Sequence, residues 1–281
     1  MLDKYKRQVM RKPEKLVIEG ETGAGKTTFA CSAHTEKEPV FVINSDDGGE
    51  KVFHKTGSNL IHDCIPTGDI KENADKWDSV MEALRELASE NTGVKRVIID
   101  SVDKLELLAQ GKVCVDHSIK APEDLGYGKA YVYASGYVQK LLSGLNYLRD
   151  TQNIQPILVC HTQIRTINKP TMEPYDSFIL KLHKSNSANI TEWADVILFV
   201  AFETIVKKID SGFNRKDSRA IQSGNRFLYT SGSMGVDAKN RFDLPPEIPA
   251  DWNEYRKLID SFWDGKKTNS ETPKKKELDE L

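Results

Sequence analysis

Short apolar runs recur along the chain and are rich in valine, isoleucine and leucine. They cover residues 16–18, 40–43, 97–99, 157–159 and 196–200. Runs that are apolar throughout are typical of strands buried on both faces. Stretches with helical spacing separate several of them, and this alternation predicts an α/β fold with a mostly parallel central sheet flanked by helices.

Two long stretches place apolar residues at helical spacing, residues 76–87 and residues 129–149. Beyond Ser223 the pattern predicts antiparallel strands and turns, a proline-rich connection and an amphipathic helix over residues 252–263. Residues 266–281 are rich in Lys, Glu, Ser and Thr, which predicts a disordered charged tail. The chain therefore divides into a basic arm (1–14), one domain (15–265) and the tail.

The charges of the chain nearly balance, with 40 Lys and Arg against 42 Asp and Glu among 281 residues. The overall charge gives no reason to expect a nucleic-acid binder, so any basic surface must be local. The longest apolar run, residues 196–202, is too short to span a membrane, and we expect a soluble intracellular protein. The four cysteines form no C-x-x-C pair, which predicts reduced packing residues.

The segment GETGAGKT, residues 20–27, matches the pattern G-x-x-x-x-G-K-[ST] between an apolar run and a helical stretch. Such a loop turns backbone N–H groups toward phosphates, and its lysine reaches the β- and γ-phosphates. We therefore predict ATP and Mg²⁺ as cofactors, with Lys26 catalytic and Thr27 ligating the metal. The predicted nucleotide contacts are Gly20, Thr22, Gly23, Ala24, Gly25, Lys26, Thr27 and Thr28. An ordinary glycine-rich turn is the alternative, and the flanking elements favour the phosphate loop.

Three more strand ends carry polar residues. Asp100 follows the run 97–99 and is predicted to hold Mg²⁺ through a water, although a turn or helix cap would use the same residue. Asp46 follows the second run and is our candidate for the group that orients the attacking water, with a solvated turn as the alternative. Gln163 follows the fourth run as a candidate γ-phosphate sensor. His161 beside it is either a second sensor or a hydrogen-bonded structural residue.

In order, the segments GETGAGKTT, VIIDSVDKL, EDLGYGKAY, LVCHTQ, KLHKSNSANITEWADVILFV and AKNRFDLP resemble a RecA-like ATPase core. More specifically, the chain resembles the small phage RecA-like ATP-binding proteins that act as single-strand annealing recombinases. The resemblance covers residues 20–245. It implies a homo-oligomer, either a filament or a ring, in the cytoplasm of a bacterial host, with a single-strand-binding protein as a possible partner.

The resemblance also assigns roles to residues. Asp46 stands where the family usually has a catalytic glutamate that is one methylene longer, and this leaves the identity of the base open. Gln163 matches the family's glutamine at the end of the fourth strand. Lys239 and Arg241 match a pair of cations that reach the ATP of the neighbouring subunit, although both could be surface cations on a turn. Two DNA-contacting loops would fall near residues 113–128 and 164–182.

The second of these loops mixes cations with aromatic rings, a mixture that suits single-stranded DNA. The candidate DNA-binding residues are Arg165, Lys169, Tyr175, Phe178, Lys181 and Lys184. Alternatively, the two rings anchor a long loop to the core. A second basic stretch, residues 207–226, is interpreted as a solvated hairpin.

These observations favour an ATP-dependent, single-stranded-DNA-binding recombination protein with DNA-stimulated ATP hydrolysis. A nucleotide-dependent regulatory switch that acts on a protein partner without DNA is the main alternative. A small-molecule kinase would share the phosphate loop, but the sequence shows no sign of the acceptor pocket and lid that a kinase needs.

Overall fold

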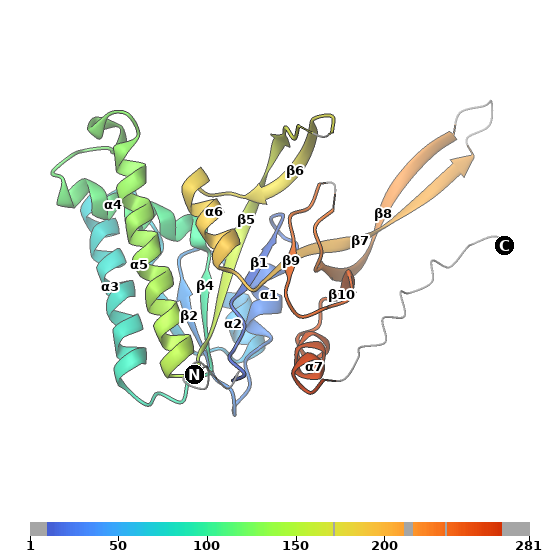
Figure 1. The fold of residues 1–281 in the computed structure, drawn as a ribbon, viewed down its shortest axis with the longest axis horizontal. Helices are drawn as coiled ribbons and strands as arrows, with labels where there is room; N and C mark the ends of the chain where they lie inside the picture. Colours follow the sequence, from blue (N-terminus) through green and yellow to red (C-terminus); the bar gives the residue numbers. More distant parts are fainter. Residues whose placement is uncertain (1–9, 171, 211–215, 234, 266–281) are drawn as a thin grey trace, which may run out of the picture.

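The computed structural model describes residues 10–170, 172–210, 216–233 and 235–265, with residues 204–210 and 216–223 described by their backbone alone. One sheet runs through the molecule in the order β10-β8-β7-β1-β5-β4-β2-β3, while β6 pairs with β5 and β9 pairs with β7 (Figure 1). The strands are β1 (Leu16–Gly20), β2 (Val40–Asn44), β3 (Leu60–Asp63), β4 (Arg96–Asp100), β5 (Gln155–Ile167), β6 (Tyr175–Leu180), β7 (Val196–Asp210), β8 (Lys216–Tyr229), β9 (Lys239–Asn240) and β10 (Glu247–Pro249).

The strands from β3 to β7 in this order are parallel, and β8, β9, β10 and β6 join the sheet antiparallel. Each of the five apolar runs lies in one of the parallel strands β1, β2, β4, β5 and β7. The predicted fold class, a mostly parallel sheet flanked by helices with an antiparallel C-terminal extension, is therefore confirmed.

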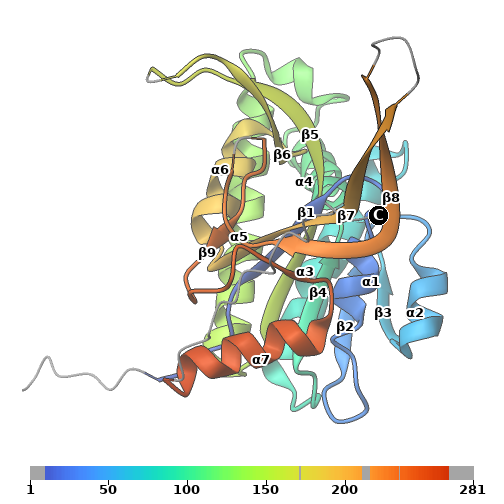
Figure 2. The same cartoon turned by 90° about the vertical axis from the view of Figure 1, so that its right-hand side faces the viewer.

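Helices cover both faces of the sheet (Figures 1 and 2). The helices are α1 (Lys26–Cys31), α2 (Glu50–Thr56), α3 (Ile70–Ser89), α4 (Val102–Asp116), α5 (Lys129–Thr151), α6 (Lys184–Trp193) and α7 (Trp252–Trp263), with a 3-10 turn over Pro122–Leu125. Successive residues of a strand point to opposite faces. Val17 of β1 accordingly packs in the cluster with α3, α4 and α5, while Leu16 and Ile18 pack with α1 and α7.

Two segments that resemble DNA-binding loops contain regular structure. Residues 113–116 form the last turn of α4, and the connection from there to Gly128 contains the short 3-10 turn. Residues 164–182 form a hairpin, because β5 continues to Ile167 and pairs antiparallel with β6. The expectation of a loop without secondary structure is therefore wrong for residues 164–182, whereas residues 117–121 and 126–128 do form a loop around the 3-10 turn. The long helix α5 and the C-terminal helix α7 agree with the predicted ranges.

The four cysteines are buried and carry free thiols, which confirms their predicted packing role. Within the described ranges, every helix is too short or too polar to cross a bilayer. The tail over residues 266–281 and the first nine residues of the basic arm lie outside the described residues.

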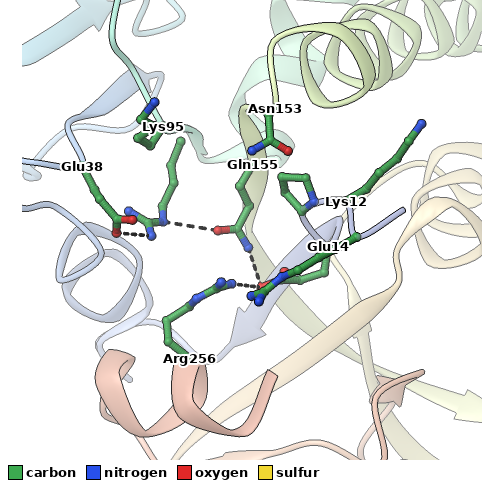
Figure 3. Close-up of a pocket in the computed structure, with 10 residues that line it drawn as sticks. Lys12, Glu14, Glu38, Lys95, Asn153, Gln155 and Arg256 are labelled. Atoms are coloured by element: carbon green, nitrogen blue, oxygen red, sulfur yellow. Dashed lines mark hydrogen bonds and ion pairs between the residues drawn. The ribbon is translucent and has the colours of Figure 1, made fainter. Parts of the chain in front are cut away.

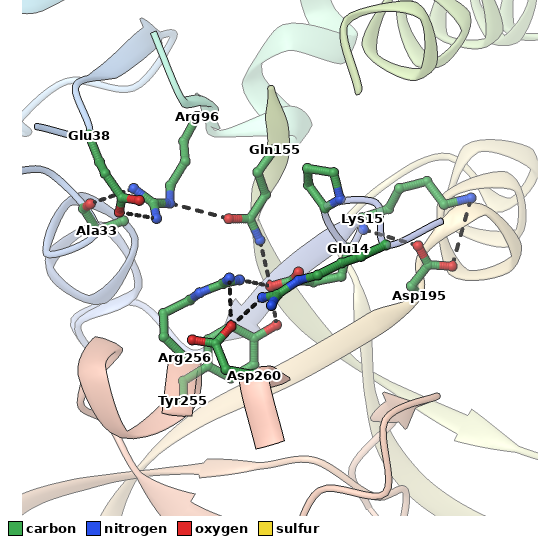
Figure 4. A network of polar contacts seen from close by, with 12 residues as sticks. Glu14, Lys15, Ala33, Glu38, Arg96, Gln155, Asp195, Tyr255, Arg256 and Asp260 are labelled. Atoms are coloured by element: carbon green, nitrogen blue, oxygen red, sulfur yellow. Dashed lines mark hydrogen bonds and ion pairs between the residues drawn. The ribbon is translucent and has the colours of Figure 1, made fainter. Parts of the chain in front are cut away.

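A buried polar network joins α7 to the end of the sheet where the parallel strands begin (Figures 3 and 4). The Glu14 carboxylate, 1% exposed, accepts hydrogen bonds from Gln155 (2.7 Å), the Tyr255 hydroxyl (3.1 Å) and Arg256 (2.8 Å). The Gln155 side-chain oxygen in turn accepts from Arg96 (3.3 Å). The network lines a cavity of about 270 Å³ and joins the start of the chain to its last helix.

Replacing the central carboxylate tests this network. Glu14→Ala removes the acceptor of the buried Tyr255 hydroxyl and the nearer of two carboxylates paired with Arg256, which keeps Asp260 at 3.3 Å. Leaving a buried donor without its acceptor typically costs about 1–3 kcal/mol. We expect a fall of this size in the free energy of unfolding, measured by urea titration. Glu254→Ala is the matched control, because its ion pair with Lys257 is exposed, and it should cause a much smaller loss. Equal losses would contradict the assigned role.

Candidate functional site

The phosphate loop is framed by the close packing of β1 between two parallel strands. Gly20 lies beside His161 of β5 on one side and Val200 of β7 on the other. A Cβ on Gly20 would lie 2.6 Å from the Val200 carbonyl oxygen, so only glycine fits where the loop begins. Gly25, directly before α1, has φ 99°, a left-handed conformation that other residues adopt only with strain. The two glycines therefore fix where the loop leaves the sheet and where it enters the helix.

Lys26 sits at the centre of this loop. Its side-chain Nζ donates to the carbonyl oxygens of Gly20 and Glu21, both at 2.9 Å, and the residue is 5% exposed. Burial lowers the pKa of Lys26, and nearby carboxylates, Asp100 first among them, oppose that shift. The ammonium group is thus held inside the loop, where the predicted contact with phosphate oxygens would take place.

Asp100 ends β4 and is almost fully buried. Burial raises the pKa of its carboxyl group, and a hydrogen bond with the Thr27 side chain opposes this. A hydroxyl group and a carboxylate group beside a phosphate loop are the usual protein ligands of Mg²⁺, which takes few protein ligands and keeps several waters. Thr27 and Asp100 therefore fit the predicted metal. The part of the chain that the structure describes has no cluster of three or more His, Cys, Asp or Glu residues suited to a metal.

His161 lies between two carboxylates at the same end of the sheet. Its Nδ1 lies 3.0 Å from Asp103 Oδ2, and its Nε2 lies 3.7 Å from Asp46 Oδ2. Asp103 also accepts from the His161 backbone N–H at 3.1 Å. Burial by itself raises the pKa of Asp103, but the bonds from His161 outweigh it and leave that pKa below its ordinary value. An ionised Asp103 favours the proton on Nδ1. The other ring nitrogen, Nε2, lies on the side of Asp46.

The structure brings together most residues predicted from the strand ends. Asp46 follows β2, and its backbone N–H donates to the Asp100 carbonyl oxygen at 3.2 Å, which joins the ends of β2 and β4. Gln163 lies two residues beyond His161 in β5 and is exposed. Residues two apart in a strand share a face, so Gln163 and His161 point the same way. The roles assigned to these residues stay predictions.

Lys239 and Arg241 lie away from the phosphate loop of their own chain. Lys239 pairs with Ile197, near the start of β7, and its Nζ donates to the Thr191 carbonyl oxygen at 2.8 Å. Arg241 donates to Asp195 at 3.0 Å. The phosphate loop begins at the other end of β1, beside Val200. Any contact of these two cations with ATP would therefore involve a neighbouring subunit.

Sequence reasoning did not identify Asp103 or Glu19 as site residues. The D-x-x-D spacing of Asp100 and Asp103 was the available signal, because it puts the second carboxylate in the first turn of a helix that starts beside the first. Glu19 gave no signal, because an acidic residue directly after the apolar run 16–18 resembles the exposed end of a strand. The structure instead places it in the central strand, 1% exposed, and among the described residues its Oε1 has no hydrogen-bond partner.

Glu19 should make stability depend on pH. Burial, followed by the charge of Asp237, raises its pKa well above the ordinary 4.5, so the folded protein keeps the proton. Below about pH 4.5 both states are protonated and there is no penalty. As the pH rises from there toward the raised folded pKa, the unfolded state loses its proton first. Folded stability then falls by up to about 1.4 kcal/mol per pH unit.

We expect wild-type protein to lose more unfolding free energy than Glu19→Gln between about pH 5 and pH 8, because the amide stays neutral at both values. Urea titrations at the two pH values measure the difference. Glu50→Gln, on the exposed start of α2, is the control and should follow wild type. If the free energies of unfolding of wild type and Glu19→Gln differ by the same amount at both pH values, Glu19 is already ionised in the folded protein.

Comparison with known proteins agrees with this geometry. The model of a family described as AAA domain matches residues 12–242, which is most of the chain and includes the phosphate loop, Asp100 and His161. No curated protein matches the sequence. The match extends over the whole parallel sheet with its phosphate loop, so the chain belongs to the AAA domain family, and it is a nucleotide-binding P-loop ATPase.

Proposed function

We propose that this ATPase is a single-stranded-DNA-binding recombination protein, of the RecA-like phage annealing type, that promotes annealing or strand pairing. One observation carries the proposal: β5 runs without a break from the nucleotide site into the β5–β6 hairpin. Its first part pairs with β1 up to His161, and its last part forms the hairpin that carries cations and exposed apolar side chains. Arg165 lies about 13 Å along the strand from His161.

The hairpin has the composition of a surface for single strands. Arg165 and Lys169 are exposed, and the Lys169 ammonium lies 5.5 Å from the centre of the Tyr175 ring. Lys169, Met172 and Tyr175 also line a cavity of about 440 Å³ beside the hairpin. Cations contact the phosphate backbone and rings stack on bases, without preference for sequence. Lys181 and Lys184, exposed at the base of the hairpin, extend the same surface.

For Phe178 we propose the anchoring role, the alternative to DNA contact. Its ring packs against Phe199 of β7, with 5.2 Å between the ring centres, and its backbone N–H donates to the Gly235 carbonyl oxygen. The structure therefore favours the anchoring alternative for this ring. In our proposal Phe178 holds the hairpin against the sheet, and Tyr175 is the ring available to bases.

His161 connects the two halves of the proposed activity. Its ring lies between Asp46 and Asp103 at the nucleotide site, and its backbone carbonyl oxygen accepts from Lys181 N–H at 2.8 Å, where β6 ends. Both strands of the hairpin are thus joined to the chain at His161. A shift of His161 on binding or loss of the γ-phosphate would move the hairpin, which is how nucleotide state would control the grip on DNA.

Within the nucleotide site, Thr27 and Asp100 would hold Mg²⁺, which supplies charge for the phosphate oxygens. Asp46 orients the attacking water and accepts its proton, with His161 Nε2 beside it. Asp103 would act through His161, which it holds by hydrogen bonds to the ring and to the backbone N–H. Lys239 and Arg241 would complete the site from a neighbouring subunit, so we propose a homo-oligomer, either a filament or a ring.

A nucleotide-dependent switch that binds a protein partner is the second candidate. Its supporting observation is the exposure of two apolar side chains on the hairpin, Ile164 at 65% and Met172 at 45%. Exposed apolar groups suit protein docking as well as base contacts. Protein docking need not depend on salt, whereas contacts with phosphates release counterions.

Asp103→Asn tests the positioning role. Loss of the charge removes the strong acceptor that fixes the His161 ring, and we expect the kcat of ATP hydrolysis to fall by about 10–100-fold. The KM for ATP should change little, because Asp103 does not contact nucleotide, and the pH profile of kcat should shift with the ring. Steady-state phosphate release measures all three. Asp116→Asn, at the far end of the same helix, is the control. An unchanged kcat and pH profile for Asp103→Asn would show that the His161–Asp103 pair is structural.

DNA dependence tests the proposed function. We expect single-stranded DNA to stimulate ATP hydrolysis, and Lys26→Ala to abolish both the basal and the stimulated rate, because the phosphate loop loses its cation. The double variant Arg165→Ala/Lys169→Ala should weaken DNA binding and flatten its salt dependence by about 0.7 in log–log slope for each phosphate that the protein no longer neutralises. The matched control is Lys71→Ala/Arg85→Ala, which removes two exposed cations from α3. Hydrolysis indifferent to DNA, together with no salt-sensitive binding, would reject the proposal in favour of the protein-partner switch.

A further inference from the structure

Arg226 lies against the phosphate loop, although it is some two hundred residues away along the chain. It belongs to β8 and pairs with Phe202 of β7. Val200 of β7 is level with Gly20 at the end of β1, so Phe202 and Arg226 lie just beyond the point where the loop begins. The long antiparallel extension of the sheet therefore brings a cation to the nucleotide site.

The contact is with Gly25, the residue before Lys26. A Cβ placed on Gly25 would lie 2.8 Å from Arg226 Nε and 3.0 Å from its Cδ. The arginine side chain thus occupies the space directly over this glycine. A guanidinium group beside a phosphate loop can donate to phosphate oxygens in its fixed fork geometry.

The side chain is held in place by its surroundings. The guanidinium carbon lies 4.8 Å from the centre of the Phe202 ring, a cation–π arrangement that fixes the plane of the group. The backbone is paired with β7, and the Arg226 carbonyl oxygen accepts from Ala250 N–H at 2.9 Å. Such support means that little side-chain freedom is lost when a ligand binds.

The order of the strands indicates which part of the nucleotide Arg226 faces. Asp100, Asp46 and His161 come from β4, β2 and β5, all on one side of β1. They mark the side of the metal and the γ-phosphate. Arg226 comes from the other side, across β7. A triphosphate lying along the loop from the metal side therefore brings its α-phosphate and nucleoside toward Arg226.

We propose that Arg226 is a nucleotide-binding residue that acts within its own chain and contacts the α-phosphate side of ATP and ADP alike, with Phe202 holding the guanidinium group. The proposal rests on nucleotide binding by the phosphate loop and adds a residue to it. It differs in kind from the role of Lys239 and Arg241, which would serve a neighbouring subunit.

The test is a titration with Mg-ADP and with a non-hydrolysable Mg-ATP analogue, followed by calorimetry. Arg226→Ala should bind both nucleotides about tenfold more weakly, equivalent to roughly 1.4 kcal/mol, because both contain the α-phosphate. Arg226→Gln keeps the length of the side chain without its charge and should weaken both to a similar extent.

Two controls separate the possible failures. Arg85→Ala removes an exposed arginine from α3 and should bind like wild type, and Lys26→Ala shows that the titration reports the phosphate loop. Circular dichroism melts show whether each variant is folded. If wild type binds nucleotide, Lys26→Ala does not, and both Arg226 variants bind as tightly as wild type, the inference is overturned. Nucleotide binding by the phosphate loop would then still stand. Weaker binding of the ATP analogue alone would also overturn it, because it would place Arg226 at the γ-phosphate. No nucleotide binding by wild type would reject the function itself, and the inference with it.

Discussion

The site depends on the fixed position of β1 between two parallel neighbours. All five residues of β1 are buried, and each is paired with β5 on one side and with β7 on the other. This pairing leaves no freedom in register, since a slip by one residue would turn every side chain to the wrong face. It also puts Gly20, His161 and Val200 at one level. The phosphate loop begins at that level, and His161 lies there between its two carboxylates. From Val200 the strand β7 continues to Phe202, which pairs with Arg226.

The two ends of the sheet treat buried charge differently. Where the strands begin, Glu14 accepts three hydrogen bonds from side chains, one of them from a cation, and the charge is well compensated. Where the strands end, burial opposes the charged form of Lys26, Asp100 and Glu19. No hydrogen-bond partner for Glu19 Oε1 occurs in the part of the chain that the structure describes. Buried groups with strongly shifted pKa values gather at functional sites, because a ligand's charge can compensate what the protein alone does not. The network around Glu14 therefore stabilises the fold, whereas the buried charges where the strands end suit a binding site.

Local patterns were sufficient to predict part of this structure. The phosphate loop and the place of Asp100 at the end of a strand are predictable because strand, turn and chemistry are adjacent in sequence, and α7 is predictable because one face of it is apolar. Helix α4 was missed because its buried residues include Asp103, Glu106 and Gly111 as well as aliphatic ones, so no clean stripe marks it. The sequence does not reveal the hairpin because the apolar run of β5 stops at Val159, while the strand continues as an exposed ribbon that needs no buried face.

The remaining site residues could not be predicted from sequence because topology alone brings them together. Arg226 reaches Gly25 only through the pairing of β7 with β1 and of β8 with β7. Asp103 meets His161 only because β5 lies beside β4, with α4 starting where β4 ends. In each case the two residues belong to different elements, and no spacing along the chain encodes their contact. A motif can therefore identify where phosphate binds, while the groups that would position it and respond to it follow from the order of the strands.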